Sequence, residues 1–349
     1  MSASRFFRTV GDVVWRPSRR AMRGLAMADI VVNAGIMVTG AAVRVTGSGL
    51  GCPTWPNCTP DSLVPRAATN PTIHTAVEFG NRLLTFLVIA VGVACLIAAL
   101  RLRHGPGGLR RPDLVKLASI QPFYVVFQAI VGGLTVLTKL NPAVVSVHFL
   151  LSVPLLAAAF ALYARAGEGD GPPVSAVRGE IRWLGRGLVA AALALIIAGS
   201  VVTGAGPHGG DPAAPRYGFN IQDVAQLHVD IVWITVGLTF ALLLALRLTN
   251  APARATRAAL ILFGVEMAQG VVGYVQYFLG VPEALVILHV LGATLVWIAT
   301  LNVYFTLRTR TDPPPAEPTP APAEASVEPP TPPTGPPARL APEAARREA

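Results

Sequence analysis

The chain has 349 residues, of which 52% are hydrophobic and only 13% are charged, and its mean hydropathy is +0.54. This composition excludes an ordinary soluble globular domain and indicates that most of the chain lies in lipid. The net charge of +9 does not indicate nucleic-acid binding, because 23 of the 28 lysines and arginines fall on one side of the predicted membrane spans.

Apolar runs of about 20 residues predict eight transmembrane helices. The excess of Lys and Arg in both terminal segments and in the loops after the second, fourth and sixth spans predicts a cell-membrane protein with both termini in the cytoplasm. The predicted spans lie near residues 25–43, 75–100, 117–138, 144–164, 184–204, 224–246, 257–279 and 284–307.

The predicted fold is an all-α integral membrane protein whose eight helices form two pseudo-symmetric four-helix bundles. The Pro- and Ala-rich tail cannot bury a core, so we expect it to be disordered. The expected segments are an N-terminal cytoplasmic segment (1–24), an N-terminal four-helix half (25–165), a cytoplasmic linker (166–183), a C-terminal four-helix half (184–307) and a cytoplasmic tail (308–349).

Two cysteines share the first external loop, Cys52 and Cys58. An oxidising compartment outside the membrane permits a disulfide between them. A metal site is the alternative for this spacing, but the loop offers no third or fourth ligand. The sequence therefore favours a disulfide or a redox-active dithiol.

The second span begins with four polar residues whose spacing (i, i+4, i+7, i+8) puts them on one face of a helix: His74, Glu78, Asn81 and Arg82. An i,i+4 ion pair between Glu78 and Arg82 is one interpretation. The other makes Glu78 a proton acceptor or charge stabiliser beside a bound porphyrin, with Arg82 available to a porphyrin propionate. The residues alone do not decide between the two.

An internal repeat pairs histidines of the two halves. The segments Gln128-Ala-Ile-Val-Gly and Gln269-Gly-Val-Val-Gly match at a shift of 141, which places His148 on His289. The Leu-Thr-Phe triplets of the second and sixth spans match at a shift of 154, which places His74 on His228.

All four histidines lie near the start of a span that runs inward, so we expect them to share one depth in the outer leaflet. Two imidazoles at one depth on neighbouring helices can bind a haem iron from both sides. A histidine that reaches the membrane interface, a proton relay and another metal site are the alternatives. Only His104 and His208 fall outside the pattern, as expected loop residues.

These motifs resemble those of haem A synthase over roughly residues 25–307. The loop from Val43 to Cys58 (VRVTGSGLGCPTWPNC) is similar to the first external loop of that family, and the segment from Glu78 to Arg82 (EFGNR) resembles its second-helix motif. The histidines of the fourth, sixth and eighth spans also fall where the family has them.

The resemblance implies an enzyme that oxidises the C8 methyl group of haem O to a formyl group through successive hydroxylations, with oxygen from water. Haem O would come from a haem O synthase, and the electrons would pass to an unidentified acceptor such as a quinone. The resemblance implies that His228 and His289 hold a haem b, and that the substrate haem lies in the N-terminal half between His74 and His148.

The resemblance further implies that Glu78 is the catalytic carboxylate and that the Cys52–Cys58 pair shapes the site or relays redox equivalents. Arg44, Asn81 and Arg82 are candidates for supporting the site, with the repeat favouring His74 over Asn81 as the iron ligand.

The chain departs from the family at two places. Asn81 stands where many members have a histidine, and no cysteine pair lies in the loop after the fifth span, which excludes an electron route through such a pair. A di-haem electron-transfer protein of cytochrome b type is the main rival, since it needs four histidines but neither Glu78 nor the cysteine loop. A transporter with parallel repeats is disfavoured because no Gly- or Pro-broken helix pair lies at midplane depth.

Overall fold

The computed structural model describes residues 17–65, 72–102, 111–310 and 335. The chain divides into two units, Met1–Asp312 and Pro313–Ala349, and every helix and strand reported below belongs to the first. Residues 1–16 of the predicted N-terminal segment lie outside the described residues, as does the predicted tail apart from 308–310 and 335. The disorder expected of the tail therefore stays a prediction.

Eight α-helices account for most of the described chain, and each is long and apolar enough to cross a membrane. The predicted eight-span, all-α membrane fold is thereby confirmed. The helices are α2 (Arg19–Val45), α3 (Ile73–Leu102), α4 (Pro112–Leu137), α5 (Pro142–Ala166), α6 (Gly179–Ala205), α7 (Ile221–Leu248), α8 (Ala253–Phe278) and α9 (Glu283–Thr306).

The structure adds local detail at both ends of the predicted halves. Helix α2 begins at Arg19, earlier than the predicted span, because Ser18 caps it with a side-chain oxygen that accepts from the Ala21 N–H at 3.1 Å. Its arginine-rich first turn is too polar for an apolar-run criterion to detect. Two short strands, β1 (Val174–Ser175) and β2 (Arg308–Thr309), pair antiparallel and join the predicted linker to the start of the predicted tail.

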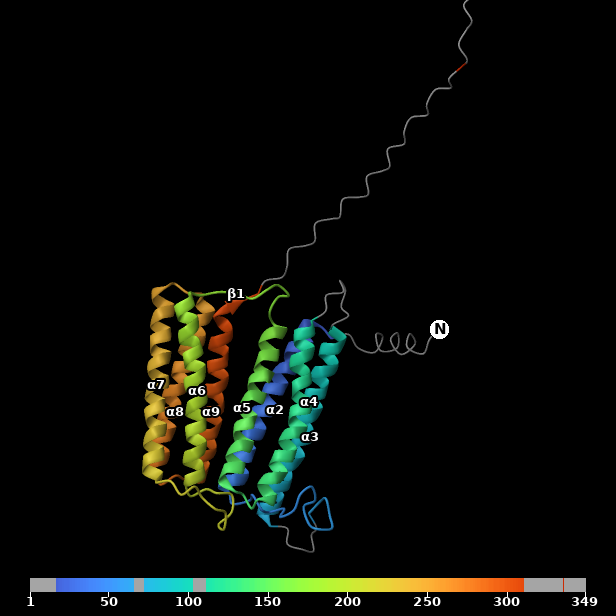
Figure 1. The fold of residues 1–349 in the computed structure, drawn as a ribbon, viewed down its shortest axis with the longest axis vertical. Helices are drawn as coiled ribbons and strands as arrows, with labels where there is room; N and C mark the ends of the chain where they lie inside the picture. Colours follow the sequence, from blue (N-terminus) through green and yellow to red (C-terminus); the bar gives the residue numbers. More distant parts are fainter. Residues whose placement is uncertain (1–16, 66–71, 103–110, 311–334, 336–349) are drawn as a thin grey trace, which may run out of the picture. The chain divides into compact units, whose positions relative to one another are not determined.

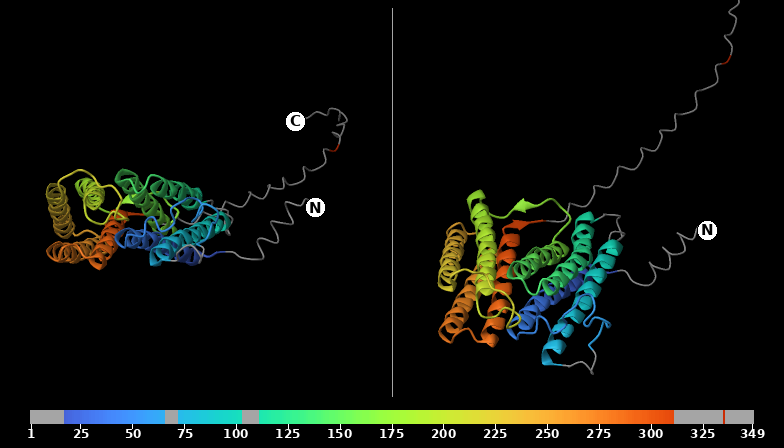
Figure 2. Two further views of the ribbon diagram at one scale, coloured as in Figure 1. Left: turned by 90° about the horizontal axis from the view of Figure 1, so that it is seen from below. Right: turned by 60° about the horizontal axis from the view of Figure 1, so that its bottom comes forward.

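Each half of the protein is a ring of four helices. In the N-terminal half α2 and α4 both contact α3 and α5, and in the C-terminal half α6 and α8 both contact α7 and α9. Figures 1 and 2 show the two bundles lying side by side. The order of neighbours is the same in both bundles, and the symmetry operation that would relate them stays a prediction.

Local geometry repeats between the halves at the predicted shift of 141. Helices α4 and α8 both have 26 residues. The turn that follows each contains a left-handed residue, Leu140 (φ 59°) or Val281 (φ 63°). The amide N–H of each donates to a carbonyl in the preceding helix, Thr135 or Gln276, at 2.8 Å. The two turns therefore present α5 and α9 at matching positions.

The two bundles meet through α2 and α5 of the first and α6 and α9 of the second. Ile30, Phe160, Trp297 and Leu301 belong to a buried apolar cluster at this junction. The Trp297 indole N–H also donates to the Val153 carbonyl at 3.1 Å. The halves therefore share a packed interface in addition to their covalent connection.

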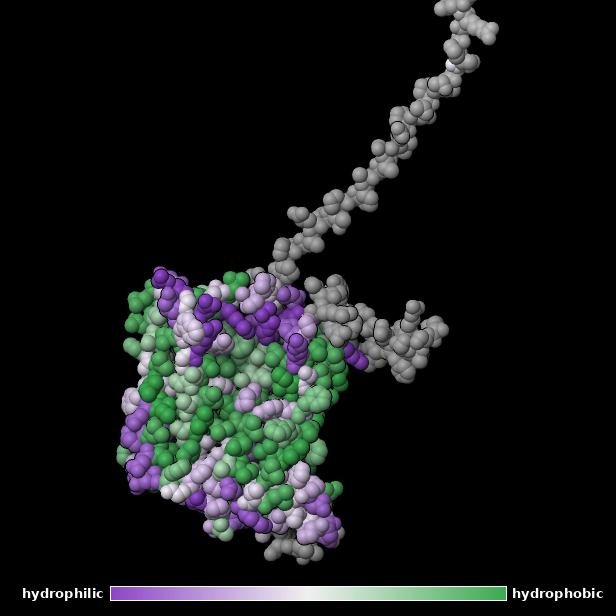
Figure 3. All heavy atoms as spheres, in the orientation of Figure 1, coloured by the Kyte–Doolittle hydropathy of each residue, from purple (hydrophilic) through white to green (hydrophobic). Residues whose placement is uncertain are grey.

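The two ends of the bundles differ in what they carry. We call the end where α2, α4, α6 and α8 begin the terminal face, and the end where α3, α5, α7 and α9 begin the loop face. Figure 3 shows a predominantly apolar band between polar zones at the two ends, as lipid contact requires. Depth in the membrane can therefore be counted along each helix from its first residue.

Candidate functional site

Three histidines lie at one depth below the loop face. His148 is the seventh residue of α5, His228 the eighth of α7 and His289 the seventh of α9. At about 1.5 Å per residue, these positions lie roughly 10 Å from the helix starts. The fourth predicted ligand, His74, is only the second residue of α3, so it lies about 8 Å nearer the loop face than the other three.

Each of these three deep histidines is opposed by a glycine on the preceding helix. A Cβ placed on any of these glycines would lie only 3.1 to 3.3 Å from the imidazole Cε1, so glycine makes room for the ring. The Nδ1 atom of each ring is buried and has no hydrogen-bond partner. A buried histidine without such a partner is costly inside a membrane protein, so the three rings are candidates for a functional site. The glycines are Gly132, Gly199 and Gly273.

The imidazoles of His228 and His289 lie next to each other in the C-terminal bundle, with ring centroids 6.4 Å apart and planes inclined by 60°. A metal–imidazole bond is about 2.0 Å long and the ring centroid lies about 1.2 Å beyond the bonded nitrogen, so two imidazoles on one metal have centroids about 6.4 Å apart. Within the described residues no three His, Cys, Asp or Glu side chains gather to hold a metal ion. The pair therefore fits a metal that brings its other ligands with it, as haem iron does.

A glutamine orients the helix of each deep histidine in the fourth and eighth spans. Gln269 donates to the His289 carbonyl at 2.8 Å, and Gln128 donates to the His148 carbonyl at 3.2 Å. Gln128 also donates to the Ser152 hydroxyl at 2.7 Å. The two glutamines are those that defined the sequence repeat, so the repeat marks matching structural contacts.

The N-terminal half lacks a matching imidazole pair. His74 is exposed, its Nδ1 lies 3.0 Å from the Ser48 hydroxyl of the external loop, and no ring contact pairs it with His148 in the described chain. Instead, Asn81 is the ninth residue of α3, and its side-chain oxygen accepts from the Thr39 hydroxyl of α2 at 2.7 Å.

Glu78 and Arg82 form the ion pair that their spacing predicted, with Arg82 Nη2 2.6 Å from Glu78 Oε1. The Glu78 side chain is 6% exposed, and its other oxygen accepts the Cys52 N–H at 2.6 Å. Arg82 donates to the carbonyls of Cys52, Thr54 and Asn57 at 3.0 to 3.2 Å. Glu78 and Arg82 therefore both hold the external loop. Their hydrogen bonds to the loop are charge-assisted, and these bonds fix the positions of the two side chains.

The external loop closes the N-terminal bundle. Cys52 and Cys58 form a disulfide, as the sequence favoured, and both are fully buried. The Trp55 indole packs so closely on Gly133 of α4 that a Cβ there would overlap the ring. The loop is thus fastened to α3 by Glu78 and Arg82 and to α4 by Trp55, next to the glycine that opposes His148.

Arg44, another candidate supporting residue, reaches the opposite half. Its guanidinium donates to the Thr203 carbonyl at 3.1 Å and to the His208 carbonyl at 2.8 Å. His208, expected to be a loop residue, bonds through Nε2 to the Val281 carbonyl at 2.8 Å. Arg44 therefore joins the α6–α7 loop to α2, away from the Glu78–Arg82 pair.

Sequence reasoning missed several buried polar groups and the histidine-facing glycines. Gly132 and Gly273 end the two repeated glutamine segments, so their repetition was a usable signal. Asp29 of α2 and Glu266 of α8 are buried in mid-helix, and each has one carboxyl oxygen without a partner. No repeat or motif distinguished these carboxyl groups, because each stands alone in an apolar stretch.

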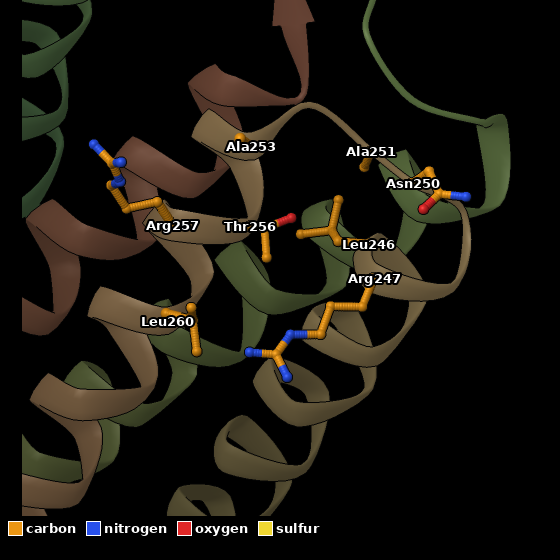
Figure 4. A pocket seen from close by; sticks show the side chains of 8 residues that line it. All are labelled: Leu246, Arg247, Asn250, Ala251, Ala253, Thr256, Arg257 and Leu260. Carbon is orange, nitrogen blue, oxygen red and sulfur yellow. The ribbon is translucent and has the colours of Figure 1, made fainter.

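A hollow at the terminal face lies apart from the histidines. It is formed around the α7–α8 turn, and Figure 4 shows Arg247 and Arg257 among the eight side chains that line it. Leu246, which also lines it, follows His228 by 18 residues of α7, or about 27 Å along the helix. This hollow therefore takes no part in the histidine site.

A family model described as COX15-CtaA, cytochrome oxidase assembly protein, matches residues 23–209 of the chain. The match spans α2 to α6 together with the disulfide loop, Glu78 and His148. It ends before α7, so His228 and His289 lie beyond it.

Individual relatives agree with this match. A Heme A synthase of Alkalihalophilus pseudofirmus is 31% identical over 149 residues, which cover 41% of this chain and 47% of that protein. A Heme A synthase of Exiguobacterium is 29% identical over 140 residues, covering 39% and 42%. A Protoheme IX farnesyltransferase of Thermus thermophilus is 30% identical over 311 residues, covering 81% and 48%. The chain spans about half the length of the curated relatives it matches.

Proposed function

Because the chain belongs to the COX15-CtaA family of cytochrome oxidase assembly proteins, we propose that it is a haem A synthase. It converts the C8 methyl group of haem O to a formyl group through successive hydroxylations. The similarity to proteins named Heme A synthase supports this assignment. The structural observation that carries it is the His228–His289 pair, whose spacing fits a resident haem.

The overall reaction sets what the protein must handle. One methyl group and one water molecule give one formyl group, four protons and four electrons, so the oxygen comes from water. The enzyme is therefore an oxidoreductase, and its electrons leave to an acceptor such as a quinone. The chain must position the methyl group, accept protons beside it and hold a redox centre.

The C-terminal half holds the redox centre. His228 and His289 would bind the iron of a haem b from α7 and α9, while Gly199 and Gly273 leave room for the rings. Gln269 fixes the backbone that carries His289. Bound there, haem b supplies one-electron redox chemistry.

The N-terminal half receives haem O. His148 lies at the depth of the C-terminal pair and is opposed by Gly132, so it is the protein ligand on one side of the substrate. Glu78 lies one helical turn before Asn81 on α3. Since the Cys52 N–H and Arg82 hold its carboxylate, Glu78 stands in a fixed position as proton acceptor or stabiliser of positive charge at the methyl carbon.

The membrane setting follows the distribution of charge. Most described arginines lie at or near the terminal face, and the positive-inside rule supports the proposal that this face is cytoplasmic and that the disulfide loop lies outside the cell membrane. The bilayer delivers the apolar tail of haem O. A haem O synthase acts upstream, which agrees with the similarity to a Protoheme IX farnesyltransferase.

The test is to express the full chain with a haem O synthase in a host that lacks haem A, and to chromatograph the extracted haems. We expect haem A, or its hydroxylated precursor, only when this chain is present. The contrary result is an extract that contains only haem O and haem b although a quinone acceptor has been supplied. Together with a bis-histidine spectrum of the purified protein, this result would favour an electron-transfer protein of cytochrome b type.

A further inference from the structure

We infer that Asn81, and not His74, occupies the fourth ligand position of the molecule, so that His148 is the only histidine bound to iron in the N-terminal half. This inference rests on the proposed haem-binding function. It concerns which side chains of this chain face the substrate haem, and it leaves the side opposite His148 open to a small ligand.

The helix bounds give the first argument. Helix α3 begins at Ile73 and ends at Leu102, whereas α7 begins at Ile221 and ends at Leu248. The starts differ by 148 and the ends by 146, so the helices align at a shift of 147. This shift places Asn81 on His228. The shift of 154 would instead pair the second residue of α3 with the eighth residue of α7.

Contacts between neighbouring helices give the second argument. Helices α2 and α6 both have 27 residues and begin at Arg19 and Gly179, a shift of 160. Gly199 of α6, which opposes His228, therefore corresponds to Thr39 of α2. Thr39 is the residue whose hydroxyl bonds to Asn81. Two independent helix alignments thus identify the same pair, Thr39–Asn81, as the counterpart of Gly199–His228.

The size of the opposing residue gives the third argument. Each of the three deep histidines of the described chain faces a glycine, because a Cβ there would already approach the ring to 3.1–3.3 Å. Thr39 carries a branched side chain at this place, which leaves no room for an imidazole on α3. The shorter asparagine fits, and the threonine hydroxyl binds its oxygen, so the two substitutions are complementary.

His74 differs from the deep histidines in three ways. It lies about two helical turns before Asn81, it is exposed, and its Nδ1 lies within hydrogen-bond distance of the Ser48 hydroxyl. Its contacts are those of a residue that holds the external loop to the start of α3. The Leu-Thr-Phe match that paired it with His228 rests on three residues, and its shift of 154 differs from the shift of 147 given by the helix bounds.

The experiment uses the purified full chain, saturated with added haem O after co-expression with a haem O synthase, and measures carbon monoxide binding to the reduced protein. Two imidazole ligands block carbon monoxide, whereas a single histidine leaves one side of the iron free. We expect about half of the bound haem to bind carbon monoxide. His148→Ala should remove that fraction, and His74→Ala should leave it unchanged.

A double variant introduces the Gly–His contact of the C-terminal half into the N-terminal half. Thr39→Gly with Asn81→His recreates the Gly199–His228 contact, and we expect it to lower the carbon monoxide-binding fraction about tenfold and to give a bis-imidazole spectrum for all haem. Asn81→His alone should do so far less, because Thr39 stays in place. If this double variant does not fold, the wild-type and His74→Ala measurements still decide.

The outcomes separate the two proposals. Wild-type protein that binds no carbon monoxide, together with a His74→Ala variant that does, would overturn the inference and leave the proposed function standing. A chain that binds no haem in either half would overturn both. A chain that holds only the His228–His289 haem under saturating haem O would overturn the N-terminal site and the inference with it.

Discussion

The two bundles use one helical framework for different purposes. In the C-terminal bundle His228 lies next to His289 and faces Gly199. At the position that we infer to correspond to His228, the N-terminal bundle has Asn81, which is hydrogen-bonded to Thr39. The N-terminal bundle adds a buried disulfide loop held by Glu78 and Arg82. Our interpretation is that a symmetric ligand pair retains a permanent haem, while an asymmetric, capped site admits a substrate that must leave again.

The two bundles also differ in the charge of the side chains beside their candidate haem sites. In the C-terminal bundle the contacts described for the two histidines come from Gly199, Gly273 and Gln269, which carry no charge. In the N-terminal bundle a fixed carboxylate and guanidinium lie within one turn of Asn81. Charged groups beside a reacting centre are what acid–base chemistry requires, and a purely electron-transferring site does without them.

The largest effect is expected from His289→Ala. Removing one imidazole of the C-terminal pair should eliminate the bis-imidazole absorption spectrum and about half of the bound haem, because His228 is then left as the one described histidine at that depth in this bundle. Haem content and spectra of the purified variant measure this. His208→Ala, which alters only a loop contact, is the matched control and should keep both haems. A retained bis-imidazole spectrum in His289→Ala would refute the pairing.

Glu78→Gln should separate chemistry from binding. The amide keeps the size of the side chain but cannot accept a proton in the same way, so we expect product formation to fall about 10²–10⁴-fold while haem content stays unchanged. Quantified haem extracts from co-expressing cells measure both. The control is Glu266→Gln, a buried carboxyl group of the C-terminal bundle, which should leave product formation near that of the wild type. Normal product formation by Glu78→Gln would remove Glu78 from the mechanism.

Gly133→Ala should damage the cap of the N-terminal bundle. The new Cβ would overlap the Trp55 indole, and we expect a loss of stability of about 1–3 kcal/mol, with looser attachment of the disulfide loop. Thermal unfolding in detergent and protease susceptibility of the loop report these effects. Gly270→Ala on α8, where nothing lies within 4 Å of the new Cβ, is the control. Equal stability of the two variants would contradict the packing argument.

The smallest effect distinguishes the two glutamines. Gln269→Leu removes one hydrogen bond, to the His289 carbonyl, and we expect it to cost about 1 kcal/mol. Gln128→Leu also leaves the Ser152 hydroxyl without its partner, so its cost should be about twice as large. Denaturation midpoints of the two variants test this order. A larger loss of stability for Gln269→Leu would contradict the expectation that the number of lost hydrogen bonds sets the cost.

Sequence alone predicted the features that depend on composition and on long matches. The eight spans follow from hydropathy, and the pairing of His148 with His289 follows from segments whose glutamines and glycines make matching contacts. The pairing of His74 with His228 rested on a match of only three residues, Leu-Thr-Phe. The counterpart that we infer for His228, Asn81, depends on where α3 and α7 begin and on which residue of α2 contacts it, and neither can be read from the sequence.

The contact between Trp297 and Val153 bears on how the two bundles come together while the chain is being synthesised. The N-terminal bundle is complete once α5 has been synthesised, well before the ribosome reaches α9. The surface that Trp297 will later cover is apolar, and Val153 offers only a backbone carbonyl that already belongs to a helix. Lipid can therefore cover this surface during synthesis at little cost, and the second bundle displaces that lipid when it docks.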